Sequence, residues 1–223
     1  MSIVNKVKSL GARATMGDDD VRALLVNDHD EAKEYASQMC DAKQARQRVA
    51  ALARLKPALT AHSRAEERVV YGALLSIRAD AEARVVTQEG FVEHGMVDEL
   101  LAKLDATDAS TEIWQAHAKV CKELLEHHID EEQTEIFADL GDNFSRDELA
   151  LMGERFLQEK ANVLRALAAG NDVAMARAPA KPRKKAARKA VRPGKSKAHT
   201  RRVGPTRPAR KVAARKPATR RQS

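Results

Sequence analysis

Residues 62–71 of the chain read HSRAEERVVY, and residues 128–137 read HIDEEQTEIF. Each stretch holds a histidine, a glutamate four residues later and an aromatic residue five residues after that, in the pattern H-x3-E-x4-aromatic. Residues four apart on an α-helix lie on one face, one turn above the other. As a helix, each stretch would therefore point an imidazole and a carboxylate into the same small volume.

A single histidine precedes each of these stretches at nearly the same distance. His29 lies 33 residues before His62, and His94 lies 34 residues before His128. The chain therefore contains an approximate repeat, with a lone histidine on one helix and H-x3-E on the next. All four histidines interrupt apolar stripes of helical spacing, which predicts that they face the protein interior.

The rest of the body is also helical in pattern, and no segment shows the two-residue period of a strand. We predict an all-α fold, an antiparallel up-down four-helix bundle with an additional C-terminal helix. Pro57 is expected to kink or restart the second helix, and Gly141-Asp142-Asn143 to stop the fourth. Ser145-Arg146-Asp147-Glu148 matches the capping box that opens a helix. The expected helices cover about residues 18–39, 42–77, 81–104, 111–140 and 145–169.

In such a bundle, four imidazoles and two carboxylates, from four helices, converge on one point. Buried carboxylates are costly unless they are paired or bound to metal. Nitrogen and oxygen ligands without thiolate suit iron, manganese or zinc, and two carboxylates able to bridge suit a pair of ions. A ferritin-like site is excluded, because it needs Glu-x-x-His and no histidine of the body has a glutamate three residues before it. The candidate metal ligands are His29, His62, Glu66, His94, His128 and Glu132.

Four short segments resemble the hemerythrin-like, HHE cation-binding domain: residues 24–29 (LLVNDH), 62–67 (HSRAEE), 93–94 (EH) and 128–132 (HIDEE). The resemblance covers about residues 18–168. It implies an antiparallel four-helix bundle with two iron ions, oxo- or hydroxo-bridged. It also implies that the four histidines are terminal ligands and that Glu66 and Glu132 bridge the metals.

The third helix departs from the pattern of the family's oxygen carriers, which have H-x3-H at that helix. Here His94 is followed four residues later by Asp98, which either ligates weakly or leaves a coordination position open. This difference favours redox, peroxide or nitric-oxide chemistry, or sensing, over oxygen carriage. Whether the protein turns over a substrate as an enzyme stays open, and so does the choice of iron over manganese or zinc.

The remaining histidines and thiols of the body are expected to be structural or exposed. His127 also has a glutamate four residues later, Glu131, but only the His128 register places an aromatic residue at position 137. We therefore expect His127 beside the ligands or at the surface. His117 has Cys121 four residues on and is expected to be structural. With Cys40, Cys121 gives two core thiols, too few for a disulfide framework or a thiolate metal site.

The C-terminal part differs sharply from the body in composition. From Arg177 to Ser223 there are 19 lysines and arginines, no acidic residue, no aromatic residue and six of the seven prolines. The first 176 residues carry 21 basic and 32 acidic residues, a net charge of −11. We therefore predict an N-terminal extension (1–17), a helical bundle (18–169) and a disordered basic tail (170–223). The tail resembles in composition the Lys/Ala/Pro tails of linker histones.

Such a tail would neutralise phosphates and release counterions, which predicts non-specific, salt-dependent binding of nucleic acid through residues 177–223. Without aromatic residues it offers no stacking platform for single-stranded bases, so duplex is the expected target. The alternatives are a solubilising tail, binding to an anionic membrane and binding to the acidic body. The sequence shows no apolar run long enough for a signal peptide or a membrane span. We expect a cytoplasmic protein, nucleoid-associated if bacterial, with no membrane partner.

Two hypotheses for function follow. The first is a di-iron protein near DNA that reacts with or senses oxygen, peroxide or nitric oxide, for sensing or protection. The second is a nucleoid-associated, DNA-binding protein with a mainly structural metal site. Iron storage ranks last, because two ions give too little capacity. The sequence leaves the oligomeric state open.

Overall fold

A computed structural model describes residues 16–77 and 81–171, all within one unit, Met1–Arg183. Most of the predicted N-terminal extension and the whole stretch from residue 172 onward, including the predicted nucleic-acid-binding segment, lie outside the described residues. Every regular element in the described ranges is a helix. The predicted all-α class is therefore confirmed.

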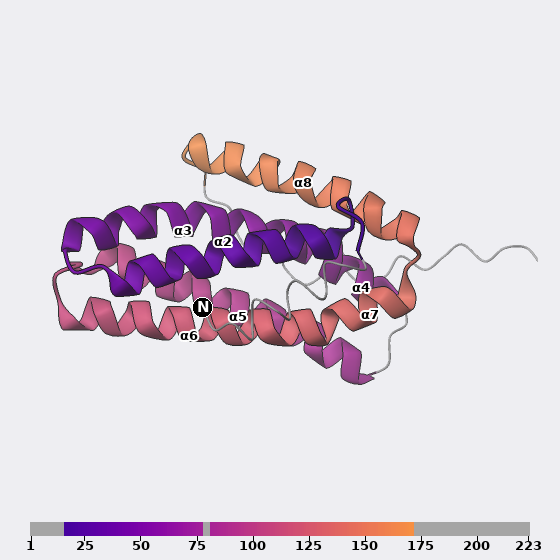
Figure 1. Ribbon diagram of the computed structural model, residues 1–223, viewed down its shortest axis with the longest axis horizontal. Coiled ribbons are helices and arrows are strands. Elements are labelled where there is room, and N and C mark those ends of the chain that lie inside the picture. The colour runs from indigo at the N-terminus through magenta and orange to yellow at the C-terminus, as the bar shows by residue number, and fades with distance from the viewer. Residues whose placement is uncertain (1–15, 78–80, 172–223) are drawn as a thin grey trace, which may run out of the picture. The chain divides into compact units, whose positions relative to one another are not determined.

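The described chain forms the helices labelled in Figure 1. They are α2 (Val21–Asp41), α3 (Ala45–Glu66), the π-helical segment η1 (Glu67–Tyr71), α4 (Gly72–Ser76), α5 (Ala81–Ala106), α6 (Glu112–Thr134), α7 (Ile136–Asn143) and α8 (Arg146–Ala168). The first three after α2 follow one another without a gap. None of the described helices is both long enough and apolar enough to span a lipid bilayer.

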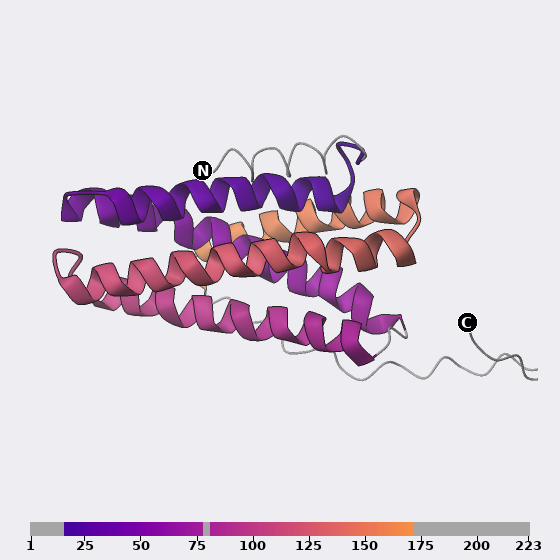
Figure 2. The same ribbon diagram turned by 60° about the horizontal axis from the view of Figure 1, so that its bottom comes forward.

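Helices α2, α3, α5 and α6 form a closed ring of neighbours. Helix α2 packs on α3 and α6, and α5 packs on α3 and α6. The connections α2–α3 and α5–α6 lie at one end of the bundle, as both views show, so consecutive helices run antiparallel (Figures 1 and 2). Helix α8 lies outside the ring against α2 and α3. This arrangement is the predicted four-helix bundle with an additional C-terminal helix.

Side chains that accept from backbone amides begin α2, α6 and α8, and at α6 the cap is Thr111, which accepts from the amide of Trp114. The Asp20 carboxylate accepts from the amide of Arg22 at 2.9 Å at the start of α2. At the start of α8, Ser145 Oγ accepts from the amide of Glu148, and Glu148 Oε2 accepts from the amide of Ser145 at 2.9 Å. This reciprocal pair confirms the predicted capping box.

The predicted restart at Pro57 and the predicted stop at Gly141 are wrong. Helix α3 runs unbroken through Pro57, so no restart occurs there. Proline removes only one hydrogen bond of the helix, and buried Leu55 and Leu59 hold this stretch against the core. The fourth helix does not stop at Gly141 either, because α7 continues to Asn143, and the irregularity falls earlier, at Glu135.

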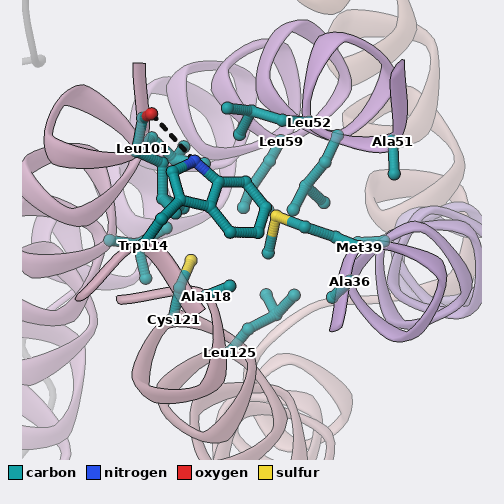
Figure 3. Close-up of a cluster of buried hydrophobic side chains, with 14 of the residues drawn as sticks. Ala36, Met39, Ala51, Leu52, Leu59, Leu101, Trp114, Ala118, Cys121 and Leu125 are labelled. Atoms are coloured by element: carbon teal, nitrogen blue, oxygen red, sulfur yellow. Dashed lines mark hydrogen bonds between the residues drawn. The ribbon is translucent and has the colours of Figure 1, made fainter. Parts of the chain in front are cut away.

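The core consists of two apolar clusters. The first, the Trp114 cluster, lies toward the α2–α3 and α5–α6 connections, and Figure 3 shows the indole ring surrounded by apolar side chains from several helices. Trp114 is buried, and its Nε1–H donates to the carbonyl of Leu104 at 3.0 Å. The Trp114 cluster comprises Ala32, Ala36, Met39, Ala51, Leu52, Leu55, Leu59, Val97, Leu101, Leu104, Ala109, Trp114, Ala118, Cys121, Leu125 and Ile129.

The second cluster, the Phe156 cluster, includes residues of α8 and of the opposite halves of the bundle helices. It comprises Val21, Leu25, Val26, Ala65, Val70, Tyr71, Leu74, Phe91, Ile136, Phe137, Leu140, Leu149, Met152 and Phe156. Gly153 allows α8 to approach the start of α2, because a Cβ atom there would lie 2.2 Å from the carbonyl oxygen of Asp19. Glycine at this position thus helps to seat α8 on the bundle.

The four predicted histidines lie between these two clusters. On α2, His29 follows Val26 of the Phe156 cluster and precedes Ala32 of the Trp114 cluster. The same change of cluster occurs around His62, His94 and His128. The bundle therefore contains a polar layer in its middle, bounded on each side by apolar packing.

Candidate metal centre

The structure brings all six predicted site residues into this polar layer. Each of them is at most 5% exposed to solvent. Every helix of the ring contributes, and the two H-x3-E helices contribute two side chains each. The six are His29 from α2, His62 and Glu66 from α3, His94 from α5, and His128 and Glu132 from α6.

The layer has two halves, each with three converging groups. In the first half, ligand atoms of His29, His62 and Glu132 all lie within 4.8 Å of one another. In the second half, the same holds for Glu66, His94 and His128. The T-shaped ring pairs repeat this division, with ring centroids 4.9 Å apart for His29 and His62 and 4.7 Å apart for His94 and His128.

Each carboxylate contacts imidazoles of both halves. Glu132 Oε2 lies 3.1 Å from His29 Nε2 and 3.7 Å from His128 Nε2. Glu66 Oε2 lies 3.4 Å from His62 Nε2 and 3.5 Å from His94 Nε2. A carboxylate that bridges two cations must reach both, and these two glutamates occupy that position.

Within residues 16–77 and 81–171, several buried atoms of the layer make no aligned hydrogen bond, although carboxylates and imidazoles lie in contact there. They are both carboxylate oxygens of Glu66, both of Glu132 and Nε2 of His29. Each unsatisfied buried polar group costs about 1–3 kcal/mol. Burial, and then the neighbouring carboxylate of Glu132, raises the pKa of Glu66 well above its ordinary value. The donor set therefore fits cations, which satisfy lone pairs and compensate paired negative charge.

Two of the histidines, His29 and His94, are held in the form that metals bind. Burial lowers the pKa of His29 and, more strongly, that of His94, so both imidazoles are neutral at pH 7. Metal ligation requires the neutral imidazole with a free ring nitrogen. The chemistry of the layer at neutral pH is therefore that of a ligand set for a first-row transition metal.

A ring of polar contacts around the bundle orients the four imidazoles through their Nδ1 atoms. Carboxylates accept from Nδ1–H of three of them, and an amide, which can present either its oxygen or its nitrogen, meets the fourth. The contacts are His62 to Asp28 (3.2 Å), His94 to Glu67 (3.1 Å), His128 to Glu93 (2.8 Å) and His29 to Gln133 (3.0 Å). A carboxylate on Nδ1–H leaves Nε2 free for a metal and directs it to the centre of the layer.

This ring of contacts was missed by the sequence reasoning, although the sequence contains a signal for it. Each of the four partners is the immediate chain neighbour of a site residue on a different helix from the imidazole it holds. Asp28 adjoins His29, Glu67 adjoins Glu66, Glu93 adjoins His94 and Gln133 adjoins Glu132. One helix thus supplies a ligand and, one residue away, the support for the next helix's ligand.

The aromatic residues of the repeated pattern cover the two lone histidines. The Tyr71 ring stacks on His94 with centroids 5.6 Å apart, and the Phe137 ring stacks on His29 at 6.5 Å. Gly90 makes room for the tyrosine, because a Cβ atom there would lie 2.5 Å from its hydroxyl oxygen. The H-x3-E-x4-aromatic spacing therefore supplies two groups to the layer and a cover for it.

Helix α8 supports the first half of the layer from outside the ring. Lys160 Nζ donates to Asp28 Oδ1 at 2.5 Å, and the other oxygen of Asp28 holds His62. The Phe156 ring packs edge-on against His62, with centroids 5.9 Å apart. The extra helix thus fixes one imidazole by both charge and packing.

Asp98, considered above as a weak ligand, belongs to neither half of the layer. Its carboxylate pairs with Arg64, which also donates from Nη1 to Glu67 at 3.1 Å. Asp98 therefore acts on the layer only indirectly, through Arg64 and the Glu67 carboxylate that holds His94. Asp98, which stands where the family's oxygen carriers have a second histidine, is thus paired with an arginine.

The other predicted residues lie where a structural or surface role would place them. The His127 side chain is 57% exposed and contacts Glu93 and Glu131. His117 is half-buried. Cys121 is buried in the Trp114 cluster, Cys40 is half-buried against that cluster, and both are free thiols.

A four-helix bundle with a buried histidine–glutamate layer defines a class of metal-binding bundles. The family model for the hemerythrin HHE cation binding domain matches residues 20–140, more than half of the chain, and the chain belongs to that family. This match confirms the resemblance drawn from the sequence, and the protein is a metal-binding, hemerythrin-like bundle. Searches among curated proteins and among solved structures give no match. Helix α8 lies beyond the matched residues.

Proposed function

We propose that the layer holds two iron ions and that this centre reacts with or senses oxygen, peroxide or nitric oxide. His29 and His62 would bind one ion, His94 and His128 the other, and Glu66 and Glu132 would bridge them. The observation that carries this assignment is the contact of each carboxylate with imidazoles of both halves. A single-ion site would give no reason for two such carboxylates.

Bound iron would supply the electrons that reduce a small oxidant, or the position that binds a diatomic ligand. The chain's own residues set the conditions for that chemistry. Two imidazoles and the shared carboxylates leave fewer protein ligands per ion than octahedral iron takes, and Asp98 is directed to Arg64 instead. The apolar clusters on both sides exclude water from the layer, which limits access to small molecules.

The proposal is tested with the full chain, purified without added metal and analysed for iron, manganese and zinc. We expect two iron ions per chain and an ultraviolet–visible band that shifts when peroxide or nitric oxide is added. Glu66→Gln and Glu132→Gln should lose that band, and Glu123→Gln, an exposed carboxylate on α6, should keep it. Protein with two iron ions whose spectrum responds to neither reagent would contradict the reactive role and favour a structural metal.

We propose further that residues 177–223 tether the protein to duplex nucleic acid. The support is the 19 basic and no acidic residues of this segment, beside a body of net charge −11. The affinity of the full chain for duplex DNA should fall steeply with salt, and truncation after Ala176 should abolish binding. His62→Ala should leave duplex binding unchanged. Equal binding by the truncated and full chains would overturn the tether.

A further inference from the structure

A second H-x3-E pair lies on the outer side of α6, one residue ahead of the inner one. His127 and Glu131 precede His128 and Glu132, and one residue corresponds to a rotation of about 100° around a helix. The His127 side chain is 57% exposed and that of Glu131 is 40% exposed. The outer pair thus presents the same two groups, at the same spacing, to solvent.

A third side chain, from α5, completes a cluster with this pair. His127 Nε2 lies 3.3 Å from Glu131 Oε1 and 3.7 Å from Glu93 Oε1. Ligand atoms of Glu93, His127 and Glu131 all lie within 4.8 Å of one another. The outer set has one imidazole and two carboxylates, whereas each inner half has two imidazoles and one carboxylate.

Glu93 connects the outer cluster to the buried layer. Its side chain is only 10% exposed, and its Oε2 accepts from His128 Nδ1 at 2.8 Å. Its other oxygen, Oε1, faces His127. One carboxylate therefore touches an imidazole of the inner layer with one oxygen and the exposed imidazole with the other.

The charge of the cluster favours a cation over a simple ion pair. In residues 16–77 and 81–171, neither Glu93 nor Glu131 pairs with a lysine or an arginine, and their shared partner is an imidazole. The two carboxylates therefore face each other across one shared imidazole. A divalent metal with nitrogen and oxygen ligands compensates their charge.

We propose that Glu93, His127 and Glu131 form a third, exposed site for a divalent first-row metal ion, at which cations are captured before they enter the buried layer. The cation site itself is independent of the proposed function. Its role in loading rests on the proposed metal centre. The shared Glu93 gives the captured ion a ligand that already contacts His128.

The cation site is tested by titrating the iron-loaded full chain with Co²⁺, followed by calorimetry and by the visible absorption of the bound ion. We expect one further Co²⁺ per chain, bound at least about tenfold more weakly by His127→Asn and by Glu131→Gln. Glu123→Gln, which removes another exposed carboxylate of α6, should bind as the unchanged chain does. No further Co²⁺, or equal binding by His127→Asn, would overturn the site.

The loading role is tested by the rate at which metal-free full chain takes up Fe²⁺ at micromolar concentration. His127→Asn should load about tenfold more slowly yet reach the same final iron content, since its inner ligands are intact. Equal loading rates would overturn the role in loading and leave the outer site standing. If the unchanged chain takes up no iron while still binding Co²⁺ at His127, the proposed function fails and the outer site does not. Circular dichroism melting of each variant verifies folding.

Discussion

The Trp114 cluster and the histidine–glutamate layer are built from the same four helices, yet they are buried in opposite ways. Around Trp114, apolar side chains pack together, and the indole N–H donates to the carbonyl of Leu104 (Figure 3). In the layer, two carboxylates and an imidazole nitrogen are buried without an aligned hydrogen bond from any described residue. The first region therefore stabilises the fold, whereas burial of the polar groups in the second lowers the free energy of unfolding.

The bundle positions the side chains of the layer by apolar packing in the two clusters on either side of it. Burial of apolar surface contributes about 25 cal/mol per Å², and the two clusters hold most of the buried apolar side chains. The layer between them has its geometry imposed from both sides, before any cation is present. Variants in the two regions should therefore separate folding from metal binding.

The largest effect is expected from Glu132→Gln. The variant removes one of the two carboxylates proposed to bridge the ions, so metal affinity should fall by more than about 100-fold, beyond the 10- to 100-fold typical of residues that support ligands. Circular dichroism should at the same time show that the variant still folds, because both apolar clusters are unchanged. A variant that keeps two ions per chain would contradict the bridging role.

Trp114→Ala should do the reverse. Removing a buried aromatic side chain costs about 3–5 kcal/mol, so the free energy of unfolding and the melting temperature should drop sharply. The iron content per folded chain should stay the same. Within the described residues, Trp114 makes no hydrogen bond or ring contact with any of the six layer residues. Loss of iron from protein that is still folded would show that the two regions are not separable.

Lys160→Met tests the support that α8 gives to the layer. The substitution leaves the Asp28 carboxylate without its ammonium partner, so His62 is held less firmly and metal affinity should fall about tenfold. Lys33→Met is the matched control, since Lys33 pairs with Asp130, whose side chain is 66% exposed and outside the layer. Competition with a chelator measures both. Equal metal affinities for the two variants would show that α8 does not support the site.

The smallest effect is expected at the start of α8. Ser145→Ala removes the cap that accepts from the Glu148 amide, which should cost about 1 kcal/mol of stability. Ser145→Asp, which can still accept that hydrogen bond, should restore most of the loss. Thermal melting checks both, and metal content should be unaffected. A loss of metal in Ser145→Ala would mean that the whole of α8 depends on its first turn.

Much of the fold and the grouping of the six residues could be predicted because both follow from helical periodicity. Spacing of four residues fixes which side chains share a face, as for His62 and Glu66, whatever the tertiary structure. The partners of the imidazoles could not be found in this way. The contact of Asp28 with His62 depends on how α2 and α3 are rotated against each other, and that of Lys160 depends on the docking of α8.

The wrong predictions at Pro57 and Gly141 also arise because tertiary structure is not visible in local sequence. Proline and glycine are local signals. Packing on both sides, by Leu55 and Leu59, overrides Pro57, and α7 continues for two exposed residues past Gly141. No single residue type marks the irregular turn of η1 or the break at Glu135. Both irregularities occur just after a carboxylate of the layer. Their place is therefore defined by the tertiary structure and not by the residue types of the segment.

That coincidence has a mechanical consequence for the two glutamates. Glu66 is the last residue of regular helix α3 before η1, and Glu132 lies two residues before the end of α6. Departures from α-helical hydrogen bonding often accompany functional sites, and their looser geometry deforms more easily than a regular turn. Each glutamate is thus anchored rigidly on its N-terminal side and compliantly on its C-terminal side. If the layer holds the two ions proposed above, a change in their spacing would be absorbed there while the Trp114 end of the bundle stays still.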